Sequence, residues 1–335
     1  MLGNKEPCTD LEFVETWRAT GGRATEIAKL LGYSTPSRVY ARRSKVEKRM
    51  GISLASAGDA GHKGRGDAGE TPNAYTQRVT IDGFTGRIVV FSDAHYWPGK
   101  EPSLAHRALI EVIKETKPKL VIANGDIFDG ARISRFPKNG WENLPRVSDE
   151  LQEACERMAE VRHAAGRARL IRTVGNHCIR FDRSLAMQAA DFEGIGGFRL
   201  SDHLKAWEEC MSIAINGNTM VKHRFNGGVH AGYNNVLKSG WNMITGHTHA
   251  LEVKPWADYN RRRYGVQGGA IADVAGQQFA YTEDNPTPWC SGFVEAMFNY
   301  NGHLLHPNLC EVIDGEAIFK NEVVISDRKK LRVAA

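Results

Sequence analysis

The sequence has no long apolar segment. None of its 335 residues belongs to a run long and apolar enough to span a bilayer, and its charged N-terminus lacks the apolar region of a signal peptide. These absences argue against a membrane-spanning protein and predict a soluble protein of the cytoplasm.

Cysteine is also scarce. The six cysteines are scattered, and no two of them form a Cys-x-x-Cys pair. This pattern argues against a disulfide framework and against a zinc finger, and it fits a reducing compartment. The net charge is only +5, so where the basic residues cluster is more informative than their total.

The N-terminal residues predict a small helical unit. Trp17, Ile27 and Leu30 are its expected core, and glycines interrupt the helical pattern between segments. A short helix, a turn and a basic helix that begins near Thr35 resemble a helix-turn-helix DNA-binding unit. The residues expected to contact phosphates or base edges are Arg38, Arg42, Arg43 and Lys45. The alternative is a small helical domain with a solvated basic face.

The composition changes twice along the chain, which predicts separate parts. Residues 1–50 are the helical unit, and residues 51–75 form a flexible linker because glycine, alanine and serine dominate there. Residues 76–326 read as an α/β domain, and residues 327–335 as a basic tail.

The α/β part alternates short apolar runs with amphipathic segments. Strands are expected at 87–91, 120–123, 168–174, 211–215, 219–221 and 241–245, and helices at 104–116, 147–164 and 229–237. Alternation of this kind favours a largely parallel sheet, and the turn signals within 292–325 favour antiparallel strands at the end.

Polar residues follow several of these apolar runs. They are Asp93, His95, Asp126, Asn176, His177, His223, His247 and His249. Since parallel strands deliver their chemistry at their carboxyl ends, we expect these residues to converge on one rim. Mixed carboxylate, amide and imidazole ligands favour Mn, Fe or Zn over Ca or Mg alone. Asp126 is expected to bridge two such ions, which would activate water and neutralise phosphate oxygens.

The motifs together are similar to those of calcineurin-like metallophosphoesterases. They are Asp93-Ala-His95, Gly125-Asp-Ile-Phe-Asp129, Gly175-Asn-His177, His223 and Gly246-His-Thr-His249. The resemblance covers residues 77–325, and the stretches at 175–183 and 289–293 resemble phage and prophage members. It implies a four-layer α/β/β/α sandwich and two divalent metal ions, with Mn favoured and Fe, Zn or Ni as alternatives. A phage protein would act in the bacterial host cytoplasm.

The resemblance also implies residue roles. The first metal ion would be held by Asp93, His95 and His249, the second by Asn176, His223 and His247, and Asp126 would bridge them. His177 would sit over the scissile phosphate, and Asp129 would orient His177. Arg180 and Arg183 would clamp phosphate, or alternatively form surface salt bridges.

Two positions depart from the family pattern. Cys178 stands where an acidic residue usually follows Asn-His, which changes the support of His177. His223 is not followed directly by glycine, and the nearby His230 is an alternative ligand. We favour His223 because it ends an apolar run.

The sequence thus predicts a two-metal phosphoesterase. The helical unit and linker favour a phosphodiesterase or nuclease that acts on DNA or RNA. One alternative is a phosphomonoesterase for nucleotides, nucleic-acid ends or phosphoproteins. Another is an inactive DNA-binding or adaptor protein, although buried acids and histidines would be costly without metal. Neither a membrane partner nor a particular oligomeric state is predicted.

Overall fold

The computed structural model describes residues 7–54, 77–136 and 142–328. Contacts divide the chain into two units, Met1–Pro72 and Asn73–Ala335, and each unit is described by itself. Nearly all of the predicted linker, and the predicted tail from residue 329, lie outside the described residues.

Within residues 7–54, three helices build the first unit: α1 (Asp10–Ala19), α2 (Ala24–Leu31) and α3 (Pro36–Met50). The side chain of Thr9 caps the first turn of α1 in a capping box with Glu12. Fully buried residues from all three helices form the core: Phe13, Trp17, Ile27, Val39 and Val46.

Leu30 was expected in this core, and that prediction is wrong. Its side chain is 63% exposed, because Ile27 and Ala28 make the buried face of α2 and Leu30 lies outside it. Period-3.6 patterns locate a helix more securely than they locate the edge of its buried face.

Arg42 was expected to face nucleic acid, and the structure contradicts this. Only 4% of Arg42 is exposed. Its guanidinium lies 2.5 Å from Asp10 Oδ1 and donates a hydrogen bond to the Cys8 carbonyl, which ties α3 to the start of α1. Arg43 is half-buried, pairs with Glu47 and covers the Trp17 ring, whereas Arg38 and Lys45 are exposed.

The second unit contains two sheets. The eight-stranded sheet has the order β14-β13-β12-β11-β2-β3-β4-β5, and the six-stranded sheet has the order β1-β6-β7-β8-β10-β9. The strands of the larger sheet are β2 (Gly86–Phe91), β3 (Leu120–Asn124), β4 (Arg169–Thr173), β5 (Glu208–Cys210), β11 (Gly292–Phe298), β12 (Asn308–Ile313), β13 (Glu316–Phe319) and β14 (Glu322–Ser326). Those of the smaller sheet are β1 (Arg78–Ile81), β6 (Ser212–Ile215), β7 (Thr219–Lys222), β8 (Asn242–Thr245), β9 (Leu251–Ala257) and β10 (Arg262–Gly268).

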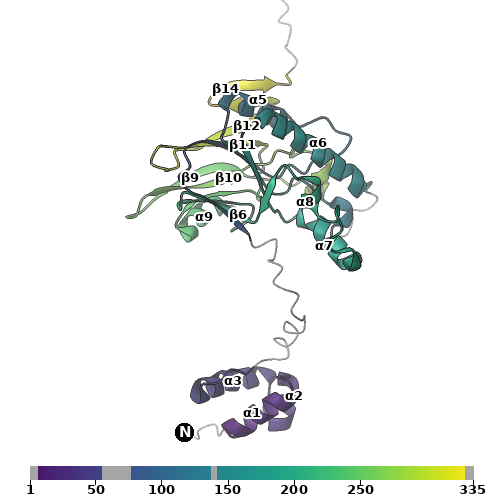
Figure 1. Cartoon of the computed structure of the whole chain (residues 1–335), viewed down its shortest axis with the longest axis vertical. Helices are drawn as coiled ribbons and strands as arrows, with labels where there is room; N and C mark the ends of the chain where they lie inside the picture. Colours follow the sequence, from purple (N-terminus) through teal and green to yellow (C-terminus); the bar gives the residue numbers. More distant parts are fainter. Residues whose placement is uncertain (1–6, 55–76, 137–141, 329–335) are drawn as a thin grey trace, which may run out of the picture. The chain divides into compact units, whose positions relative to one another are not determined.

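The two sheets pack face to face, and helices cover their outer surfaces (Figure 1). The helices are α5 (Leu104–Thr116), α6 (Val147–Ala165), α7 (Ile179–Gln188), α8 (Leu200–His203) and α9 (Ala231–Ser239). Alternation along β2 explains the layers, because Ile88 and Val90 point into the cluster between the sheets while Val89 and Phe91 point into the cluster under α5 and α6. α9 packs on β8, β9 and β10. The predicted four-layer α/β/β/α sandwich is confirmed.

The predicted strand directions are also confirmed. β2, β3, β4 and β5 pair in parallel, and β11 to β14 pair antiparallel. β1, β5, β9 and β10 were not predicted from the sequence, nor were α7 and α8. β9 alternates apolar and charged residues only over 251–254, and Pro255 then argues against a strand. β10 begins with two arginines and contains two glycines, so it lacks apolar alternation.

None of the helices in the described ranges combines the length and apolar character needed to span a membrane.

Candidate metal centre

The predicted polar residues lie just beyond the carboxyl ends of five strands. Asp93 and His95 follow β2, Asp126 follows β3, and Asn176 and His177 follow β4 in the larger sheet. His223 follows β7, and His247 and His249 follow β8 in the smaller sheet. Since β2, β3 and β4 are parallel neighbours, as are β7 and β8, the two sheets supply this rim jointly.

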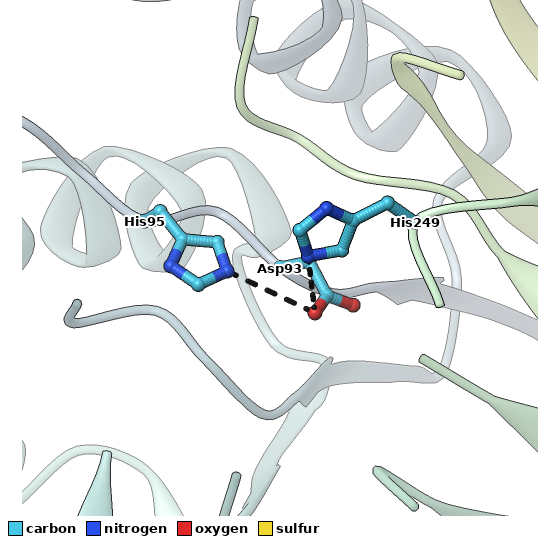
Figure 2. A group of neighbouring side chains, drawn as sticks. All are labelled: Asp93, His95 and His249. Carbon is cyan, nitrogen blue, oxygen red and sulfur yellow. Dashed lines mark ion pairs between the residues drawn. The ribbon is translucent and has the colours of Figure 1, made fainter. Parts of the chain in front are cut away.

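Asp93, His95 and His249 form the first group of potential ligands (Figure 2). His249 Nε2 lies 3.2 Å from Asp93 Oδ1, and His95 Nε2 lies 3.9 Å from the same oxygen. One ligand atom of each residue lies within 4.8 Å of the other two, and all three side chains are buried. The group has the size and donor types of a site for one divalent ion.

Asp126, His223 and His247 form the second group. His223 Nε2 lies 2.9 Å from Asp126 Oδ2 and 3.2 Å from Asn176 Oδ1. His223 Nδ1 contacts the Asn124 carbonyl at 2.8 Å, where it donates, so neutral His223 presents an unprotonated Nε2 to these two oxygens. Acceptors that face each other in this way need a cation between them.

Backbone amides clamp one oxygen of each central carboxylate. Asp126 Oδ1 accepts hydrogen bonds from the N–H groups of His177 at 2.7 Å and Cys178 at 3.3 Å. Asp93 Oδ2 accepts one from the N–H of His247 at 2.8 Å. Each acid therefore has one oxygen fixed by the next strand-end loop and a second oxygen left over.

The remaining atoms fit a metal centre. Asp93 Oδ1, Asp126 Oδ2 and His95 Nε2 are buried atoms without a hydrogen-bond partner. Unpaired buried polar atoms are costly, and a cation removes that cost when the atoms converge. The mixed nitrogen and oxygen donors suit Mn, Fe or Zn.

The backbone at this rim is strained. Eleven non-glycine residues in the described ranges have positive φ, and five of them are potential ligands: Asp93, His95, Asp126, His247 and His249. Histidine and aspartate adopt this left-handed region at a cost, and such residues concentrate at functional sites.

Two glycines allow the close approach of neighbouring loops. A Cβ atom on Gly175 would lie 2.0 Å from Asp126 Oδ1, and a Cβ atom on Gly125 would lie 2.4 Å from His223 Nδ1. Gly125 also has φ of +84°, which other residues rarely adopt. Both glycines belong to the predicted motifs, and the close approach of these loops to Asp126 and His223 depends on them.

Asp129 connects the metal centre to His177. Its Oδ1 atom lies 2.6 Å from His177 Nδ1, as the sequence analysis expected, and also 2.8 Å from His95 Nδ1. Arg180 donates to the Asp129 carbonyl at 2.9 Å, and its second terminal nitrogen lies 3.3 Å from His177 Nε2. Arg180 thus lies at the centre, whereas Arg183 is exposed.

The charges of the two groups depend on one another. Burial lowers the pKa of His95, but the carboxylates of Asp129 and Asp93 raise it overall to about 10. Burial opposes the charge of His223 in the same way, yet Asp126 and Asp93 raise its pKa to about 9. Divalent ions that bind these rings must therefore compete with protons.

The structure distinguishes His223 from His230. His223 is 2% exposed and lies against Asp126, whereas His230 is exposed at the start of α9. The structure therefore supports His223 as the ligand. Arg38 and Lys45 belong to the helical unit, which is described by itself.

Sequence reasoning missed several residues at the rim. The carbonyl of Asn124 holds the His223 ring, and Asn124, just beyond the strand predicted at 120–123, was given no role in the site. Phe279 and Trp289 pack on His249, with ring centroids 5.1 Å and 4.5 Å from its ring. Nothing in their local sequence signals this contact, because they come from a connection between β10 and β11 that lacks periodicity.

The fold and the rim define a metal-dependent phosphoesterase. The family model for calcineurin-like phosphoesterases matches residues 86–269, and the chain belongs to that family. This family binds divalent metal ions.

Several proteins are similar to this chain. The Gene 54 proteins of Mycobacterium phages L5 and D29 are each 24% identical over 254 and 256 residues, which is 68% of this chain and 94% of each phage protein. Among solved structures, Vps29 of Entamoeba histolytica complexed with Zn²⁺ is 15% identical with a TM-score of 0.38, over 71% of this chain and 98% of that one. Yfce, a phosphoesterase from E. coli, is 13% identical with a TM-score of 0.31, over 66% of this chain and 97% of that one.

Replacing His223 tests the second group of ligands. We expect His223→Ala to bind about one Mn²⁺ per chain less than the wild type, because it removes a buried donor. His230→Ala is the matched control and should bind as the wild type does. Metal content is measured by mass spectrometry after equilibrium dialysis, and the reverse pattern would make His230 the ligand.

Proposed function

We propose that this protein hydrolyses phosphodiester bonds of nucleic acid with two divalent metal ions, Mn²⁺ in the first place and Fe, Zn or Ni as alternatives. The observation that carries the proposal is the pair of ligand groups, one containing Asp93 and one containing Asp126, each with a buried carboxylate oxygen that lacks a hydrogen-bond partner. Two bound divalent ions lower the pKa of water and neutralise phosphate oxygens.

The contacts support these ligand roles. Asp93, His95 and His249 would hold one ion, and Asn176, His223 and His247 would hold the other. Asp126 would be the ligand that the two ions share, and backbone amides fix its carboxylate by holding Oδ1.

His177 and Arg180 act on the substrate in this proposal. Asp129 accepts from His177 Nδ1 and thereby aims His177 Nε2 away from the carboxylate. His177 Nε2, which accepts from Arg180 in the structure, first takes a proton from solvent and then gives that proton to the leaving oxygen. Arg180, which lies beside Nε2, turns its planar fork to the phosphate. Cys178 contributes its backbone N–H to Asp126, a role that its side chain does not affect.

The helical unit favours nucleic acid as the substrate. One side of α3 carries the exposed residues Ser37, Arg38, Ala41, Ser44, Lys45 and Lys48. Small side chains alternate with basic ones on this side, and Glu47, the one acidic residue of α3, is paired with Arg43. Such a side suits the phosphates and groove of DNA. In this division of labour, residues 1–50 bind nucleic acid, residues 51–75 link, and residues 76–326 catalyse.

The phage relatives support a place of action. Both Gene 54 proteins come from mycobacteriophages. By analogy, the proposed place of action of this protein is the cytoplasm of a bacterial host.

Turnover of a model diester tests the reaction. With Mn²⁺ we expect hydrolysis of bis-p-nitrophenyl phosphate to exceed that of p-nitrophenyl phosphate, measured as kcat/KM from released nitrophenol. Asp126→Asn should lower both by about a hundredfold or more, because the shared ligand loses its charge. Asp314→Asn is the matched control, since Asp314 has a similar φ but lies in an exposed turn. Full activity of Asp126→Asn, or a preference for the monoester, would contradict the proposal.

Salt-dependent binding tests the helical unit. The double variant Arg38→Ala/Lys45→Ala should bind duplex DNA about tenfold more weakly and show a shallower salt dependence, because phosphate contacts release counterions. The full chain is titrated in EDTA, which prevents cleavage, and binding is followed by fluorescence anisotropy. Arg18→Ala, an exposed change on α1, should leave binding unchanged. Equal binding by all three proteins would remove the argument for nucleic acid from this unit.

A further inference from the structure

Three aromatic residues stand against the first group of ligands. Phe279 and Tyr281 belong to the 3₁₀ helix η4 (Gln277–Thr282), and Trp289 lies in the segment between η4 and β11. The Phe279 ring is 5.3 Å from His95 and 5.1 Å from His249, centroid to centroid. The Trp289 ring is 4.5 Å from His249 and 5.2 Å from Phe279. The cluster thus forms a wall beside the metal centre.

The three rings differ in how much solvent they meet. Phe279 is only 2% exposed, so its role is to pack behind the histidines. Tyr281 is 54% exposed, and its ring lies 6.2 Å from Trp289 and 6.4 Å from Phe279. Trp289 is half-buried. Tyr281 and Trp289 therefore present aromatic surface at the edge of the centre, and packing behind the histidines does not require Tyr281.

Charged residues of the site affect the pKa of the Tyr281 hydroxyl. Burial and the charge of Asp129 raise its pKa to about 12, with Arg180 acting in the opposite direction. The phenol therefore stays neutral and keeps a hydrogen to donate. The Tyr281 ring is thus partly exposed and lies against Trp289, which itself packs on His249, so it borders the first group of ligands.

We propose that Tyr281 and Trp289 form a stacking platform for the nucleobase beside the scissile phosphate. This inference rests on the proposed function. Aromatic rings bind any base through its π-face and so give affinity without sequence preference. The phosphate lies at the metal centre in this arrangement, and the adjoining base lies on the wall that begins at His249.

Two diesters with the same leaving group test the platform. Thymidine 5′-(p-nitrophenyl phosphate) carries a base, whereas methyl p-nitrophenyl phosphate does not. In Tyr281→Ala we expect KM for the thymidine ester to rise about tenfold, while kcat and the constants for the methyl ester stay within about twofold of the wild type. Tyr281→Phe should keep the wild-type KM, because the ring remains. Tyr300→Ala is the control. Tyr300 is exposed in the turn after β11, near the start of β2, whereas the metal centre lies beyond the end of β2.

The outcomes are separable. An equal loss for both esters, or no rise in KM for the thymidine ester, would overturn the platform. Calorimetric titration of the Mn²⁺-loaded protein with thymidine 5′-monophosphate and with methyl phosphate tests it without turnover. Tyr281→Ala should weaken only the nucleotide, and equal weakening of both ligands would overturn the platform. Wild-type protein that cleaves neither ester, yet binds the nucleotide through Tyr281, would contradict diester hydrolysis and retain the platform.

Discussion

The hydrogen bonds from the His177 and Cys178 amides to Asp126 Oδ1 are the constraint on which this centre depends. They join the end of β3 to the loop after β4, and Gly175 allows the two to approach. The amide of His247 holds Asp93 in the same way and joins β8 of the other sheet to β2. The second oxygen of each carboxylate, Asp93 Oδ1 and Asp126 Oδ2, is buried without a hydrogen-bond partner. A bound cation would remove the free-energy cost of burying these oxygens.

The same contacts between strand-end loops account for the strained backbone around the centre. Five potential ligands have left-handed backbones, and such conformations persist only where surrounding structure enforces them. The pairing of strand-end loops across the rim supplies the enforcement, as when the His95 amide donates to the Asp126 carbonyl. Asp129 adds a further constraint, because its Oδ1 atom positions the rings of both His95 and His177. The rings of His95, a proposed ligand, and His177, the proposed proton donor, are thus coupled through a single carboxylate.

Much of this arrangement could be predicted from the sequence, because apolar runs that end in Asp, Asn or His mark the carboxyl ends of buried strands. The two groups around Asp93 and Asp126 contain only predicted residues, and their role as ligands stays a prediction. What could not be predicted depends on contacts between distant segments. Arg42 gave no sign in its own helix that Asp10 would bury it, and Pro255 argued against a strand at β9, which pairs with β10 in the folded chain. The second contact of Asp129, to His95, also arises only in the folded chain.

The central claim is that Asp126 lies between two metal ions. Anomalous diffraction from crystals grown with Mn²⁺, recorded on both sides of the Mn absorption edge, tests it most directly. The account predicts two peaks about 3.5–4 Å apart that share Asp126 Oδ2, one beside His249 and one beside His223. A single peak held by Asp93, His95 and His249, with Asp126 out of reach, would contradict it.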